Sequence, residues 1–209
     1  MMPDATLLPP AKAKLCRLAG AVFLLSALAM PFVIVTAGVT PGASPYCDTG
    51  DGCVWKAQPG VLLAEETRIE VAASPVTQRR FDAYAARGDV RIGLALIDAV
   101  DTVPFALLIL SVGLALRRLG GAGRDALPQA LRWLRRAAIA AIAWSLAQPV
   151  YESLLETLLS PGTPDGAMIV LSIGFGMIGT ALLLAFAAYA AVWALEAAVR
   201  AQRDLAEFI

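Results

Sequence analysis

Four carboxylic acids interrupt stretches of the chain that are otherwise apolar, and these residues have the clearest capacity for chemistry. They are Asp98 and Asp101 in the stretch 92–116, and Glu152 and Glu156 in the stretch 137–159. Each pair is spaced by three or four residues, so both members share one face of a helix. Neither stretch contains a Lys or Arg, and an unpaired charge inside a bilayer is costly. We therefore expect the acids to face other helices or water.

Two interpretations of these acids remain open. In the first, Asp98, Asp101 and Glu152 converge on a water-filled pocket, and the group holds a proton or binds a cation, because clustered carboxylates repel one another. Pro104 and Pro149 lie beside the acids and favour such an opening. In the second, the acids, including Glu156, are separate and each reaches water on its own.

Cysteine chemistry is concentrated in one turn-rich segment. Cys47 and Cys53 are six residues apart, and we expect this segment to face an oxidising compartment, where disulfides persist. The sequence predicts a disulfide between them, with Cys16 left as a free thiol. The alternatives are two free thiols or a metal site, but metal binding lacks further Cys or any His ligand.

A basic cluster precedes the stretch 137–159. Arg132, Arg135 and Arg136 are spaced i, i+3, i+4 and form one helical face, with Trp133 beside them. Such a face anchors a helix to anionic lipid, and Trp prefers the same interface. We predict a lipid-facing basic anchor, with specific lipid or protein recognition as the alternative.

The composition excludes several classes of function. The chain of 209 residues is 58% hydrophobic and 16% charged, and it has no His. The absence of His removes the commonest metal ligand and general base, and no phosphate-binding glycine loop is present. Its net charge is zero, which does not favour nucleic-acid binding. We predict a protein that is not an enzyme, with no catalytic residues, metal or cofactor.

The elements that must position these residues are four apolar stretches, each long enough to cross a bilayer as a helix. They are residues 18–39, 92–116, 137–159 and 167–195. The sequence predicts an all-α polytopic membrane protein, a four-transmembrane-helix bundle forming a single membrane domain over residues 1–209. Gly174, Gly176 and Gly179 would provide close packing, within the bundle or in a homo-oligomer. A cleaved signal peptide is the alternative for the first stretch.

The orientation follows from Lys and Arg in the short connections. Arginines concentrate in the loop 117–136, and the two chain ends are also basic, whereas the loop 160–166 has no basic residue. We therefore predict a multi-pass protein of the cell inner (plasma) membrane, with both termini cytoplasmic. The large loop 40–91 would then be extracytoplasmic.

Within that outer loop, two short elements are predicted. Thr67–Val71 alternates like a strand. Residues 77–87 have the spacing of an amphipathic helix in which Phe81, Tyr84 and Ala85 share one face. That face would lie on the membrane surface or dock a partner.

From residue 91 onward the chain resembles the bacterial domain-of-unknown-function family 2975. The resemblance rests on the segment Leu131-Arg-Trp-Leu-Arg-Arg136, on the glycine-bearing fourth stretch, and on the charged C-terminal end 201–209. It implies a small four-helix membrane protein with a large first outer loop. It also implies a regulatory role, because members are commonly encoded beside a small helix-turn-helix regulator, and it supplies no catalytic residues.

Two classes of function therefore remain. The first is a non-enzymatic, structural or regulatory membrane protein that senses or binds a partner, in the membrane or the cytoplasm, without binding nucleic acid itself. The second is a small transporter, or a protein that binds a cation or proton through the outer-half carboxylates.

Overall fold

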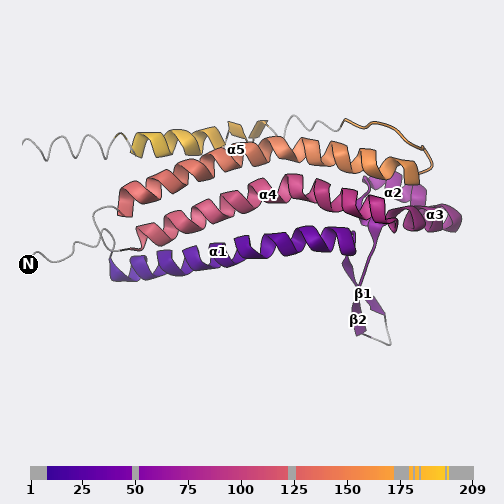
Figure 1. The fold of residues 1–209 in the computed structure, drawn as a ribbon, viewed down its shortest axis with the longest axis horizontal. Helices are drawn as coiled ribbons and strands as arrows, with labels where there is room; N and C mark the ends of the chain where they lie inside the picture. Colours follow the sequence, from indigo (N-terminus) through magenta and orange to yellow (C-terminus); the bar gives the residue numbers. More distant parts are fainter. Residues whose placement is uncertain are drawn as a thin grey trace, which may run out of the picture. The chain divides into compact units, whose positions relative to one another are not determined.

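The fold is mostly helical, and its longest helices contain the first three predicted apolar stretches (Figure 1). The computed structural model describes residues 9–48, 52–121 and 126–171, together with 179–180, 182–183, 185–195 and 197. Of residues 46–48 and 52–53 it describes the backbone alone. The predicted all-α class is confirmed, and the described residues add one small two-stranded sheet.

The three long helices begin well before their apolar stretches. They are α1 (Pro10–Val39), α4 (Gly88–Leu119) and α5 (Ala126–Leu159). The segments that precede the apolar stretches of α1 and α5 are rich in Ala, Leu, Lys and Arg, which are good helix formers, so nothing in them ends the helix. Each helix also continues through one internal proline, at Pro31, Pro104 and Pro149.

The prediction of four membrane-crossing helices is corrected to two among the described residues. Only α1 and α4 are long and apolar enough to cross a membrane by length and composition. Helix α5 contains the predicted stretch 137–159, but Gln148 and the acids Glu152 and Glu156 dilute its apolar character.

The fourth predicted stretch does not start as a helix. Residues 168–171 are not helical, and hydroxyl groups of α5 and the following turn bind their backbone instead: Val170 N–H donates to Thr157 Oγ1 (3.1 Å) and Met168 N–H to Ser160 Oγ (3.1 Å). Residues 172–178, with Gly174 and Gly176, lie outside the described residues. Farther on, the described residues Ala185–Leu195 form an apolar helix.

The chain divides into two compact units. Unit 1 comprises Met1–Met30, Val103–Leu146 and Phe175–Ile209. Within it, glycines bring α1 and α4 into close contact: a β-carbon at Gly20 would lie 2.8 Å from the Gly113 carbonyl oxygen, and one at Gly113 would lie 3.0 Å from Phe23 Cβ. The rings of Phe105 and Trp144, 5.0 Å apart, connect α4 to α5.

Unit 2 comprises Pro31–Thr102 and Ala147–Gly174. Besides parts of the long helices, it contains the 3-10 turns η1 (Pro59–Leu62) and η2 (Ser160–Gly162) and the helices α2 (Glu65–Ala72) and α3 (Pro75–Ala85). Its buried core consists of Val71, Phe81, Val90, Leu94 and Leu159.

The strand predicted at Thr67–Val71 is wrong, because these residues belong to α2. A five-residue alternation fits a helix equally well when only one member is buried, and here that member is Val71. The predicted amphipathic helix is α3, two residues earlier at its start. Phe81 and Ala85 do share one face, but the predicted contact of that face with the membrane surface or a partner is wrong, because both side chains are fully buried within the protein.

A β-hairpin follows α1, formed by β1 (Ser44–Asp48) and β2 (Gly52–Lys56) in antiparallel register. The base of the hairpin is closed by Gln58 N–H, which donates to the Pro41 carbonyl (3.2 Å). Gly42 has a φ of 62°, and a β-carbon there would overlap the Gln58 carbonyl oxygen, so this position requires glycine.

Among the side chains that the structure describes, no cysteine pair lies at disulfide distance, and the predicted disulfide between Cys47 and Cys53 falls on side chains outside them. The backbone register does place the two residues directly opposite each other. The described part of the hairpin is held by its ladder of antiparallel backbone pairs. The side chains of this pair lie outside the described residues.

Candidate functional sites

The predicted acids on α4 have neutral polar partners. Gln148 Nε2 on α5 donates a hydrogen bond to Asp101 Oδ1. Asp98, one turn before Asp101, accepts a hydrogen bond at its Oδ2 from Thr102 Oγ1 at 3.1 Å. Both acids are half-buried and carry electrostatic interaction with each other. The two acids of α4 and the facing amide of α5 therefore form one polar site within unit 2.

The predicted glutamates of α5 take different positions. Glu152 is exposed, whereas Glu156 is half-buried one turn later. Between the glutamates and the aspartates lies Tyr151, which is half-buried and interacts electrostatically with Asp98, Asp101 and Glu152. Among the described residues, no three Asp, Glu, Cys or His side chains are grouped so that they could hold a metal ion. The site therefore offers carboxylates, an amide and a phenol, which are groups that exchange protons or bind water.

The predicted basic anchor forms an exposed face on α5. Arg132, Arg135 and Arg136 are all exposed, and the Arg136 guanidinium lies 4.4 Å from the centre of the Trp133 ring. This cation–π contact holds the arginine beside the aromatic ring. Also in unit 1, Lys12, Lys14 and Arg17 of α1 and Arg117 and Arg118 of α4 are exposed. Contact of these groups with lipid stays a prediction.

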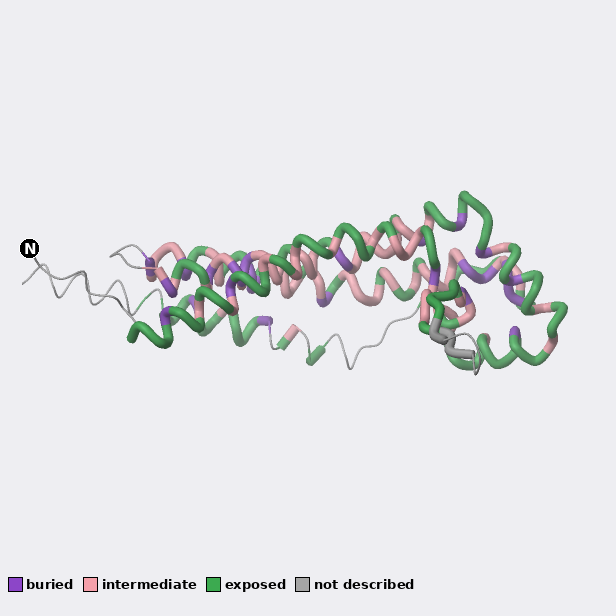
Figure 2. Tube along the Cα trace, turned by 90° about the horizontal axis from the view of Figure 1, so that it is seen from below, coloured by how far each residue is buried: buried purple, intermediate pink, exposed green. Residues whose placement is uncertain are grey.

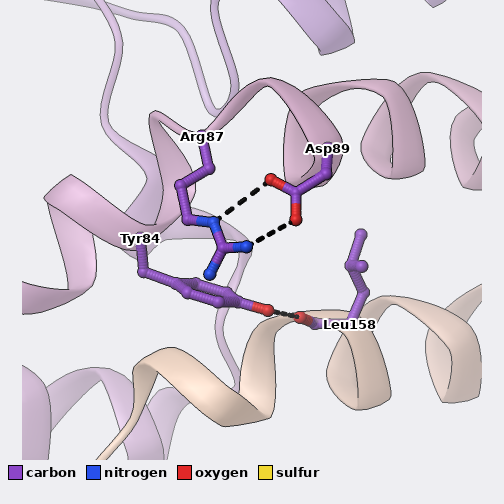
Figure 3. A network of polar contacts seen from close by, with 4 residues as sticks. All are labelled: Tyr84, Arg87, Asp89 and Leu158. Carbon is purple, nitrogen blue, oxygen red and sulfur yellow. Dashed lines mark hydrogen bonds and ion pairs between the residues drawn. The ribbon is translucent and has the colours of Figure 1, made fainter.

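A polar junction, which the sequence did not indicate, attaches α3 to α4 and α5 (Figure 3). Tyr84 Oη donates to the Leu158 carbonyl at 2.9 Å. Arg87 follows, with its guanidinium 5.5 Å from the Tyr84 ring and two hydrogen bonds to Asp89, of 2.7 and 3.2 Å. The bonded guanidinium lowers the pKa of the Asp89 carboxyl, which precedes the apolar stretch of α4. Of the residues in this junction, the sequence placed only Tyr84 on the apolar face of its helix.

Two further contacts complete this attachment. Arg91 Nη2 donates to the Val39 carbonyl at 2.6 Å, so it binds one of the last carbonyls of α1, which lack a partner in the helix. Gly162 lies against the ring of Tyr84, because a β-carbon there would be 2.7 Å from Tyr84 Cδ1. The segment between α1 and α4 is therefore a folded module, held to α1, α4 and α5 within unit 2.

This module contains a cavity of about 400 Å³. It lies among the end of β2, η1, α2 and α3. Its charged and amide-bearing lining residues are Lys56, Gln58, Arg68, Gln78 and Asp82. Its apolar lining includes Val61, Val71 and Phe81. Sequence reasoning missed this cavity, because it arises only when α2 folds back on α3.

Comparison with protein-family models, with curated proteins and with solved structures finds no match to this chain. The resemblance to domain-of-unknown-function family 2975 therefore stays a prediction.

Proposed function

We propose that this protein is an integral membrane protein that displays a small folded binding module outside the cytoplasm. The observation that carries the proposal is the exposure of its most apolar helices. In the most apolar 18-residue stretch, only 6% of the residues in α1 and 22% in α4 are buried. The core helices of a water-soluble protein would be mostly buried, since exposed apolar surface of this extent is unfavourable in water. Lipid is the solvent that suits such surfaces.

Most residues along the long helices are exposed or half-buried (Figure 2). On α1 the exposed side chains include Leu18, Phe23, Leu28 and Val33, which are spread over more than half of the helix circumference rather than along one stripe. Helix α5 joins the proposed bundle because its polar group Gln148 bonds to α4.

The proposed orientation places both termini in the cytoplasm, as the distribution of Lys and Arg indicates. The exposed arginine face of α5, stacked on Trp133, is suited to anionic headgroups on that side. The module between α1 and α4 would then face the opposite compartment. We assign the protein a non-enzymatic role in sensing or partner binding, which is also what the family resemblance implies.

The attachment of the module supports a sensing role. Tyr84 and Arg91 bind backbone carbonyls at the ends of α5 and α1, so a ligand that orders the module also constrains those helix ends. A change in the module's stability is thereby coupled to the helices.

The test is extraction and topology mapping of the full chain. Alkaline carbonate treatment of membranes should leave the protein in the pellet, and a phosphatase reporter inserted after Ala64 should be active while one fused at residue 209 should be inactive. The control replaces Arg132, Arg135 and Arg136 with Glu, which should mix the two orientations because the positive bias is removed. Release into the soluble fraction, or an active reporter at residue 209, contradicts the proposal.

A second candidate function is proton or cation movement through the polar site. The hydrogen bond from Gln148 to Asp101, within otherwise apolar helices, favours it. In proteoliposomes, the double change Asp98→Asn with Asp101→Asn should abolish flux, while Asp165→Asn in the exposed loop should leave it unchanged. Wild-type flux no greater than that of protein-free liposomes rules this candidate out.

A further inference from the structure

We propose that the cavity of the outer module binds a small organic monocarboxylate with an apolar or aromatic body. The inference deepens the proposed function, because it names the ligand class that the module would sense. The cavity of about 400 Å³ falls within the range of small-molecule sites. It is formed entirely within unit 2, by β2, η1, α2 and α3.

The apolar part of the cavity is rigid. Phe81 and Val71 line it, and they are 0% and 3% exposed because they also belong to the buried core. A side chain locked by core packing presents a preformed surface, so a ligand does not have to order it on binding. An aromatic or aliphatic body gains by covering the exposed part of the lining, where Val61 is 51% exposed, since that removes apolar area from water.

The polar part of the cavity favours a single negative charge. Lys56 and Arg68 contribute two positive charges to the lining, and Asp82 contributes one negative charge. Counted over the lining residues alone, without Glu65 beside Arg68, the excess is one positive charge. This excess suits a carboxylate, whereas a doubly charged phosphate would also meet the repulsion of Asp82. The amides of Gln58 and Gln78 add hydrogen-bond donors to the same lining.

Arg68 can serve a ligand without losing a strong partner. Its present ion pair with Glu65 is 3.4 Å long, and both side chains are exposed, at 44% and 78%. Exposed pairs of this kind contribute little stability. A carboxylate in the cavity can therefore replace Glu65, and the planar guanidinium binds carboxylates through two parallel hydrogen bonds.

The chain offers a variant that closes the cavity without disturbing the fold. Gly60 lines the cavity, and a β-carbon built there meets no atom within 4 Å. Its φ is not in the left-handed region, so a larger residue is not strained by the backbone. The leucine side chain of Gly60→Leu should therefore fill the space that the ligand would occupy.

The experiment measures binding to the full chain in nanodiscs of zwitterionic lipid, by saturation-transfer NMR, with empty nanodiscs as the blank. The probes are 4-phenylbutyrate and its uncharged amide, which share one body and differ in the charge of the head. We expect the carboxylate to bind about tenfold more tightly than the amide, as one charge-assisted contact warrants. Arg68→Gln and Lys56→Gln should each reduce this preference, and Gly60→Leu should abolish binding of both probes.

Arg79→Gln is the matched control, because Arg79 is exposed on α3 but does not line the cavity. Equal binding of the two probes, no binding of either, or an equal loss in Arg79→Gln and Arg68→Gln would each overturn the inference. Because nanodiscs expose both faces, this result does not depend on orientation. Failed binding with correct extraction and topology refutes the ligand assignment alone, whereas failed extraction refutes the proposed function.

Discussion

Removal of the Tyr84 hydroxyl tests the attachment of the module between α1 and α4 to α5. Tyr84 Oη donates to the Leu158 carbonyl at 2.9 Å. Leu158 lies in the last turn of α5, where the carbonyls have no amide partner in the helix. The phenol therefore caps this helix end from a residue 74 positions earlier in the chain.

The magnitude follows from what Tyr84→Phe retains. The ring stays in place, including its contact with Gly162, so packing is preserved and only the hydrogen bond is lost. The group is partly buried. The net contribution of such a bond is about 1 kcal/mol, rising toward about 3 kcal/mol if the carbonyl is left without any partner. We expect the free energy of unfolding to fall by about 1 kcal/mol.

The assay is a denaturant titration of the full chain in micelles, combined with hydrogen exchange. Exchange should accelerate at the backbone amides of residues 158–160, 162 and 163 and of α3, because local opening becomes easier. Tyr189→Phe, in the Ala185–Leu195 helix, removes the same hydroxyl from a site without this contact to Leu158 and serves as the control. If Tyr84→Phe unfolds like the wild type and its exchange is unchanged, the reasoning about this cap is refuted.

Two further perturbations concern helix packing and pH. Gly20→Val should prevent native assembly of unit 1, because its β-carbon would lie 2.8 Å from the backbone oxygen of Gly113; circular dichroism melting should report the loss, and a stable variant would contradict the contact. Arg87→Gln should raise the pKa of Asp89 toward its ordinary value of 3.8, as followed by NMR titration, because its largest lowering contribution is the Arg87 hydrogen bond. Because the pKa of Asp89 is lowered in the folded protein, its carboxylate stabilises the fold above pH 3.8, and this stabilisation is lost as the pH falls through the pKa of the folded state. The variant should therefore lose this part of the acid dependence. An unchanged titration of Asp89 would refute the assignment.

The helices were predictable wherever a local pattern sufficed. Apolar runs located the centres of α1, α4 and α5, and the spacing of Phe81, Tyr84 and Ala85 located the inner face of α3. The ends of the helices were not predictable, because polar flanks such as those containing Lys12 and Arg132 are helical but lack the apolar pattern that locates a helix. Alternation over Thr67–Val71 misled for a related reason, since five residues cannot distinguish a strand from a helix with one buried member.

The candidate sites were predictable only in part. The sequence singled out Asp98 and Asp101 by their charge in an apolar stretch, but not the particular partners, Thr102 and Gln148. The cavity of the module gave no signal at all. Its lining comes from four elements whose residues have no distinctive pattern in the sequence. These residues form a cavity only when the four elements pack around the same space.

The sequence by itself determined the helical class and the apolar character of α1 and α4, because both depend on composition and periodicity within one segment. It also determined that Asp98 and Asp101 share a face, which is a consequence of helix geometry. Only the tertiary structure decided that Tyr84 caps α5, that Gly162 must admit its ring, and that a cavity opens between α2 and α3. These features depend on distant segments meeting, and the energy of such contacts exists only after the chain has folded back on itself.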